Sequence, residues 1–97
     1  MIGQEKICID NVVYTRYKMH KGYFDIMSPD QNIKDSFEAW LETTETGKWA
    51  KKNCVKLYWV SQVNSMMASR DVIYFGYMTE KQYTMYLLKF SKNVVQV

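Results

Sequence analysis

The sequence has little of the material from which linkers, disulfide frameworks and membrane spans are built. It contains one proline, four glycines and two cysteines in 97 residues, and no run approaches eighteen consecutive apolar residues. Residues 1–10 also lack the charged and apolar run of a signal peptide. These absences exclude a collagen-like chain, a disordered tail, a multidomain enzyme and a membrane-spanning helix. We therefore expect one compact domain over residues 1–97, located in the cytoplasm and without a membrane partner.

Residues that carry chemistry are equally scarce. Cys8 and Cys54 have no paired spacing, and both lie in apolar segments, so we expect two buried free thiols. His20 is the only histidine, which excludes a site with two histidine ligands, and we expect it in an exposed turn. The Thr-Gly-Lys triplet at 46–48 resembles the end of a phosphate-binding loop, but Glu42 stands where that loop needs glycine. The sequence therefore predicts no catalytic residues, no metal and no cofactor, and we do not expect an enzyme.

Runs of β-branched and aromatic residues predict strands, and turn-forming residues separate them. The expected strands are 5–9, 12–19, 23–27, 54–60 and 71–78. Asp10-Asn11 is a candidate two-residue turn, and His20-Lys21-Gly22 supplies a second turn. The polar stretch Ser61–Arg70 is expected to be a loop or a single helical turn, and Gly76 is expected at a bulge. The first third of the chain therefore reads as a β-meander.

A helix is the most clearly predicted element, over residues 33–46. Its apolar residues recur at helical spacing on one side, and acidic residues occupy the other. The apolar stripe consists of Ile33, Phe37, Trp40, Leu41 and Thr44. Asn32 is the expected N-cap, and Gly47 is the expected glycine that ends the helix.

The C-terminal segment is compatible with two structures. Thr79 and Gln82 have the spacing of a capping box, and Tyr83, Tyr86, Leu87 and Phe90 fit a helical stripe. However, the same segment is dense in aromatic residues that favour strands, so we prefer a hairpin. The predicted fold class is α+β, an antiparallel sheet of five or six strands with one main amphipathic helix, 33–46, packed on one face.

Charge and aromatic residues point to a binding surface. The stretch from Gln31 to Gly47 has a net charge of −3, whereas that from Lys48 to Arg70 has +5 and no acidic residue. Fifteen aromatics and seven methionines are more than so small a chain can bury, so some should form an exposed apolar patch. The predicted binding residues are Lys48, Trp49, Lys51, Lys52, Lys56, Trp59, Met66, Met67 and Arg70. An acidic helix followed by a basic segment, which needs no partner, is the simpler explanation of the charge.

Basic residues interleaved with aromatic ones also favour a second ligand class, single-stranded RNA or DNA. Aromatic rings stack on bases, and cations follow the phosphates. Strand alternation places Tyr14, Arg16 and Lys18 on one face of the sheet, and the predicted nucleic-acid set adds Trp49 and Lys52. No known RNA-binding motif is present.

Segments between Phe37 and Phe90, among them Phe-Glu-Ala-Trp-Leu, Thr-Gly-Lys-Trp and Ile-Tyr-Phe-Gly-Tyr-Met, resemble small orphan proteins of large tailed bacteriophages. The resemblance implies a C-terminal hairpin and a role in host takeover or counter-defence, but it assigns no functional residue. We therefore expect a small non-catalytic binding protein, a phage-encoded inhibitor that occludes a host or defence protein in the host cytoplasm. Nucleic acid is the alternative partner, and a homodimer is compatible with the sequence.

Overall fold

The structure, a computed structural model, describes residues 5–90. The elements in chain order are β1 (Lys6–Ile9), β2 (Val12–Asp25), α1 (Asp30–Thr43), α2 (Glu45–Asn53), β3 (Lys56–Asn64), β4 (Ser69–Met78) and α3 (Glu80–Phe90). The expectation about a signal peptide falls partly on residues 1–4, which lie outside the described residues.

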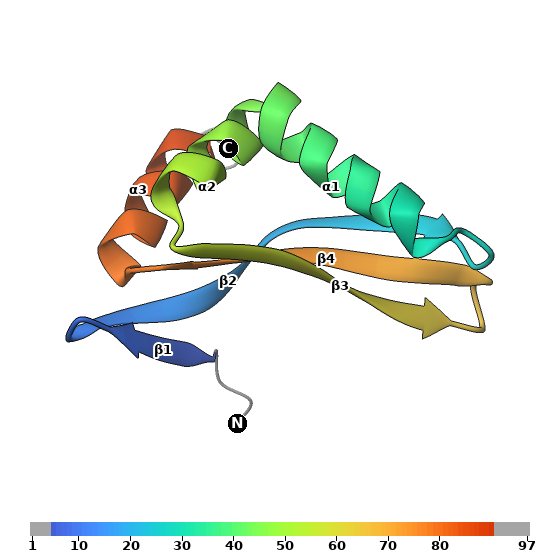
Figure 1. The fold of residues 1–97 in the computed structure, drawn as a ribbon, viewed down its shortest axis with the longest axis horizontal. Helices are drawn as coiled ribbons and strands as arrows, with labels where there is room; N and C mark the ends of the chain where they lie inside the picture. The colour runs from blue at the N-terminus through green and yellow to red at the C-terminus, as the bar shows by residue number, and fades with distance from the viewer. Residues whose placement is uncertain (1–4, 91–97) are drawn as a thin grey trace, which may run out of the picture.

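The four strands of residues 5–90 form one antiparallel sheet in the order β1-β2-β4-β3. All three helices of this part of the chain lie on the same side of the sheet (Figure 1). The α+β class is therefore confirmed, but the sheet has four strands rather than five or six. The helical layer also differs from the prediction, because it contains three helices rather than one.

The predicted first hairpin is confirmed. Asp10 and Asn11 have φ angles of 52° and 66°, the left-handed pair that a type I′ turn requires. The register pairs Ile9 with Val12 and Cys8 with Val13. Cys8 is exposed and Cys54 is partly buried, and both are free thiols. The expectation of two buried thiols is thus wrong for Cys8, because its strand lies at the edge of the sheet.

The predicted turn at His20-Lys21-Gly22 is wrong, because β2 continues through it to Asp25. The strand pairs with β4 on both sides of a register shift between Lys18 and His20. A bulge there absorbs one extra residue without reversing the chain. Gly22 does not have a positive φ, and His20 is an exposed strand residue whose ring lies 5.1 Å from that of Tyr74.

The predicted helix stripe is confirmed from Ile33 to Leu41, but Thr44 lies outside the helix and both predicted helix ends are wrong. Ile33, Phe37 and Trp40 are buried along α1, which begins after Pro29 rather than at Asn32. Proline is well suited to this position, because it cannot donate a backbone hydrogen bond. At the other end α1 stops at Thr43 and a second helix begins at once.

The side chain of Thr44 starts the second helix, because its Oγ1 accepts a hydrogen bond from the backbone N–H of Gly47 at 2.9 Å. Gly47 therefore lies inside α2 and does not end α1. A Cβ atom at Gly47 would overlap the carbonyl oxygen of Trp40, so glycine permits the close contact between the two helices. The strand that was predicted from Cys54 begins two residues later, at Lys56, because Cys54 caps the end of α2.

The predicted loop Ser61–Arg70 is mostly strand. β3 continues to Asn64 and β4 begins at Ser69, so only four residues form the hairpin turn. The backbone N–H of Met67 donates to Asn64 Oδ1 at 3.2 Å, and Ala68 has a φ of 51°. No bulge occurs at Gly76, whose register with both neighbours is continuous. A Cβ there would lie 2.8 Å from the Sγ atom of Cys54, so close packing explains this glycine.

The preferred C-terminal hairpin is wrong, because the segment is the helix α3. Gln82 N–H donates to Thr79 Oγ1 at 3.1 Å, and Thr79 N–H donates to Gln82 Oε1 at 3.0 Å, which completes the capping box. The rings of Tyr83 and Tyr17 stack with centroids 3.8 Å apart and planes 7° apart. Helical spacing also directs Tyr86 toward the sheet, where its hydroxyl lies 3.5 Å from the carbonyl oxygen of Met19.

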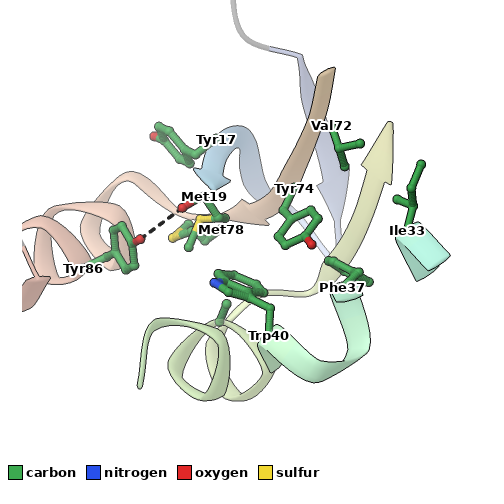
Figure 2. Packing of buried hydrophobic residues seen from close by; sticks show 10 residues of the cluster. Tyr17, Met19, Ile33, Phe37, Trp40, Val72, Tyr74, Met78 and Tyr86 are labelled. Carbon is green, nitrogen blue, oxygen red and sulfur yellow. Dashed lines mark hydrogen bonds between the residues drawn. The ribbon is translucent and has the colours of Figure 1, made fainter. Parts of the chain in front are cut away.

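The core lies between the helices and one face of the sheet (Figure 2). At its centre the Tyr74 ring lies 5.2 Å from that of Trp40 and 4.8 Å from that of Phe37, the latter edge-on. Such contacts between aromatic rings add about 0.5–1.5 kcal/mol per pair to the stabilisation from burial. The sheet contributes Tyr17, Met19, Val72, Tyr74 and Met78 to this core, and the helices contribute Ile33, Phe37, Trp40, Ala50 and Tyr86.

Candidate nucleic-acid interface

The second face of the sheet has no helix over it among residues 5–90 (Figure 1). We call it the open face. Side chains that are paired across an antiparallel sheet point to the same side, so the register gives its composition row by row. One row is Arg16, Tyr77 and Lys56, and the next is Lys18, Phe75 and Tyr58. The third row is Lys21, Ile73 and Val60.

Aromatic rings form a layer at the centre of this face. Phe75 and Tyr77 are only 8 % and 3 % exposed although no described helix packs on them. The ring of Tyr58 lies 5.5 Å from that of Phe75 and 6.3 Å from that of Tyr77. An uncovered sheet face normally carries polar side chains, so buried rings here are unusual.

Cationic side chains shield these rings from solvent. The guanidinium carbon of Arg16 lies 4.3 Å from the centroid of the Phe75 ring. The Lys56 ammonium lies 5.5 Å from the Tyr58 ring and 5.8 Å from the Tyr77 ring. Contacts of this kind at exposed sites contribute about 0.5–1 kcal/mol each, so a stronger anionic partner can draw the cations away.

Hydrogen bonds hold the edge of the aromatic layer. Arg16 donates to the Tyr58 hydroxyl at 3.0 Å, and its guanidinium lies 3.7 Å from the Glu5 carboxylate. The hydroxyl of Tyr77 donates to the same carboxylate, and this hydrogen bond, with burial, raises the pKa of Tyr77 to about 12. The hydrogen bond from Arg16 to Tyr58 raises the pKa of the guanidinium. Tyr77 is therefore neutral and Arg16 charged at any physiological pH.

Charge is unevenly distributed along the open face. The two aromatic rows carry three cations, Arg16, Lys18 and Lys56, against the single carboxylate of Glu5. Asp25 and Asp71 lie farther along, in the rows nearest the β3–β4 turn. The positive charge is therefore concentrated where the rings are.

The predicted nucleic-acid residues divide between two sides of the sheet. Tyr14, Arg16 and Lys18 share the open face, as the alternation predicted. Trp49 and Lys52 lie on α2, in the helical layer on the opposite side (Figure 1).

The predicted nucleic-acid set left out three rings of the open face, those of Tyr58, Phe75 and Tyr77, although Tyr58 stands in a run of basic and aromatic residues with Lys56. The predicted strand 71–78 already held the signal for two of them. In β4, Phe75 and Tyr77 alternate with Tyr74 and Met78, which face the core.

Part of the predicted protein-binding surface does come together. Lys48, Trp49 and Lys52 line a pocket of about 380 Å³ between α2 and the end of α3, where Lys89 joins them. The ring of Trp49 packs on those of Tyr86 and Phe90, with centroids 5.3 and 6.4 Å apart.

The other predicted binding residues are dispersed. Lys51 pairs with Glu42, whose pKa this contact lowers. Lys56 lies on the open face, and Trp59 packs against the core. Met66 and Met67 lie at the hairpin tip, 94 % and 72 % exposed.

Arg70, the remaining predicted binding residue, is engaged in hydrogen bonds within the protein. Its guanidinium donates to the carbonyl oxygen of Ser28, to Asp30 and to Ser61, all within 2.7 Å. It therefore fastens the start of α1 to the sheet and is not free to meet a partner.

Comparison of the chain with protein-family models, with curated proteins and with solved structures finds no match. Within residues 5–90 no helix is both long and apolar enough to cross a membrane.

Proposed function

We propose that the protein is a non-catalytic binding domain that holds single-stranded RNA or DNA on its open face. The observation that carries this proposal is the pair of rows Arg16-Tyr77-Lys56 and Lys18-Phe75-Tyr58, in which cations lie over aromatic rings on a sheet face without a described helix. Every nucleobase has a flat face and every nucleotide carries a phosphate, so both halves of the motif find a complement in such a strand.

On binding, the cations exchange their aromatic partners for phosphates. When a strand approaches, Arg16 and Lys56 leave the ring faces and pair with phosphates, and the uncovered rings of Tyr58 and Phe75 accept stacked bases. Each exposed cation–ring contact that is given up costs about 0.5–1 kcal/mol, and Arg16 also gives up its hydrogen bond to Tyr58 and its ion pair with Glu5. Stacking of one base on an aromatic ring contributes about 1–3 kcal/mol.

The number of cations determines how salt should affect binding. Three cations of the aromatic rows can neutralise three phosphates. Since each neutralised phosphate of a single strand contributes about −0.7 to the slope of log K against log salt, we expect a slope of about −2. Affinity should therefore be modest and should fall about fourfold for each doubling of the salt concentration.

Fluorescence anisotropy of labelled twelve-nucleotide poly-dT and poly-U, at several salt concentrations, tests the proposal. Lys18→Glu and Lys56→Glu should each weaken binding and reduce the salt slope. Tyr58→Leu keeps an apolar side chain but removes the ring, and it should weaken binding about 5- to 150-fold, which is one stacked base.

Lys81→Glu is the matched control for the charge reversals. Lys81 is exposed in the first turn of α3, where a carboxylate is compatible with the helix dipole, and α3 belongs to the helical layer. It should bind as the wild-type protein does. No binding at low salt, or equal losses for Lys56→Glu and Lys81→Glu, would refute the proposal.

A second candidate function is recognition of an acidic partner protein by the surface of α2 and α3. Met85 and Leu88 are 53 % and 72 % exposed, and with Trp49 and Lys89 they line a pocket of about 410 Å³. It shares Trp49 and Lys89 with the pocket described above, which is lined by three lysines and one carboxylate, that of Glu45. An apolar strip with adjacent cations fits an inhibitor that occludes an acidic apolar site on its target.

Affinity capture followed by reconstitution with the purified partner tests this second function. The double variant Lys48→Glu/Lys52→Glu should lose the partner, whereas Lys18→Glu, on the other side of the sheet, should retain it. A partner that tolerates the double variant but not Lys18→Glu would refute this candidate.

A further inference from the structure

One edge of the sheet, the outer side of β3, offers unpaired backbone to another chain. β3 is nine residues long, and its register with β4 is continuous from Lys56 to Asn64. Within residues 5–90 no strand pairs with its outer side. The N–H and C=O groups that point outward therefore have no strand partner in this part of the chain.

Soluble proteins usually protect such an edge with charges, proline, a bulge or a short strand. The opposite edge of this sheet follows that rule, because β1 has only four residues, and the part of β2 beyond it carries Lys18, Lys21 and a bulge between Lys18 and His20. β3 has no proline and no bulge, and its only charged residue, Lys56, stands at one end. Val60 and Val63 are exposed, at 38 % and 65 %.

We propose that β3 pairs antiparallel with β3 of a second copy of this chain, so that two four-stranded sheets become one continuous sheet. A two-fold contact of this kind closes on itself and gives a dimer. The proposal rests on the edge strand alone and does not depend on what the open face binds.

The register of the pair follows from the faces of the strand. Directly opposed residues share a face, so a two-fold axis normal to the sheet must pass beside a residue that opposes its own copy. Only an axis at Val60 pairs all nine residues of β3. Lys56 then faces Asn64 of the second copy, and Leu57 faces its Val63.

This pairing is self-complementary in charge and in apolar character. The two Lys56 side chains lie at opposite ends of the interface, so no like charges oppose each other. Val60 meets its own copy on the open face, with Cβ atoms about 5 Å apart, as directly opposed residues are. The two helical layers lie on one side of the joined sheet, and the two open faces become neighbours on the other.

Sedimentation equilibrium over a range of concentrations is the first test. We expect a species of twice the 11.6 kDa chain mass. Val60→Lys places two ammonium groups against each other at the axis and should raise the dimer dissociation constant by at least about tenfold. Val12→Lys is the matched control, because Val12 is 40 % exposed at the start of β2, away from this edge, and it should leave the dimer unchanged.

Cross-linking tests the register in a background with Cys8→Ser and Cys54→Ala. Val60→Cys should form an intermolecular disulfide rapidly on mild oxidation, since directly opposed Cα atoms lie within the range that a disulfide spans. Val63→Cys should not, because it lies three residues from the axis and about 20 Å from its own copy.

Several outcomes would overturn the proposal. A protein that stays monomeric at millimolar concentration excludes the dimer, and a dimer indifferent to Val60→Lys must use another surface. Equal cross-linking at positions 60 and 63 would indicate random collision. Monomers that pair only with an added extended peptide would assign the edge to a different partner.

Discussion

Gly47→Ala should destabilise the protein although alanine is the better helix former. Within a helix, replacing glycine with alanine gains about 1 kcal/mol. Here the new Cβ would overlap the carbonyl oxygen of Trp40, and it would lie 2.6 Å from the carbonyl carbon of Trp40 and 2.8 Å from Thr44 Oγ1. Two of these atoms are backbone, so they cannot rotate away, and α1 and α2 must move apart.

Overpacking of this kind costs about 1–3 kcal/mol, and the rigid backbone places Gly47→Ala at the upper end. Subtracting the gain in helix propensity leaves a net loss of about 2 kcal/mol. For a chain of this size the loss corresponds to a fall in melting temperature of about 8–16 °C. Urea unfolding followed by tryptophan fluorescence measures the free energy of unfolding, and calorimetry measures the melting temperature.

Gly22→Ala is the matched control for this experiment. A Cβ at Gly22 would have His20 Nε2 as its nearest neighbour, at 3.9 Å, and the backbone there does not have a positive φ. Its stability should be unchanged or slightly raised, because alanine restricts the unfolded chain. If Gly47→Ala were as stable as Gly22→Ala, the reasoning about the contact between α1 and α2 would be refuted.

Two further predictions concern α3 and the thiol of Cys54. Thr79→Ala removes the hydroxyl that accepts from Gln82 N–H and should lower the free energy of unfolding in urea by about 1 kcal/mol, whereas Thr84→Ala, inside the same helix, should not lower it. Burial raises the pKa of Cys54 from 9.0 to about 12, so the folded protein holds this proton more tightly than the unfolded chain. The contribution of Cys54 to the free energy of unfolding should be constant below pH 9. It should fall from pH 9 toward 12, by at most about 1.4 kcal/mol per pH unit. Cys54→Ala should reduce the fall in the free energy of unfolding between pH 9 and 10, a range below that in which Tyr77 contributes. An unchanged slope in that range would contradict the assignment of the fall to Cys54.

Local signals predicted the elements that depend on neighbours in sequence. The stripe of Ile33, Phe37 and Trp40 predicted α1, and Asp10-Asn11 predicted the first hairpin, because a few adjacent residues contain all the information. The prediction that Gly47 ends the helix was wrong for a related reason, since a glycine after a helical stripe usually does end the helix. Its contact with the carbonyl group of Trp40 exists only once α1 and α2 have packed.

Elements decided by distant partners were predicted poorly. His20 and Gly22 are ordinary turn residues, and only their pairing with Tyr74 and Val72 keeps them in β2. Tyr83 favours a strand by propensity, but its stacking on Tyr17 stabilises a helix there.

The candidate site has the same limitation as the fold. The alternation of Tyr14, Arg16 and Lys18 identified one strand of the open face. Phe75 lies in a strand that was predicted, but its role depends on which face the helices cover. Packing across the whole chain determines which face of the sheet the helices cover, and no local sequence pattern predicts it.

The ladder between β2 and β4 has a consequence for synthesis on the ribosome. Its partners are 44 positions apart at Asp25 and Ser69, and 63 apart at Thr15 and Met78. At about 5–20 residues per second, the second strand is made about 2–13 seconds after the first. For that time β2, with Tyr17 and Met19, has only the short β1 beside it. A nascent chain of this protein should therefore engage chaperones until Met78 has left the ribosome.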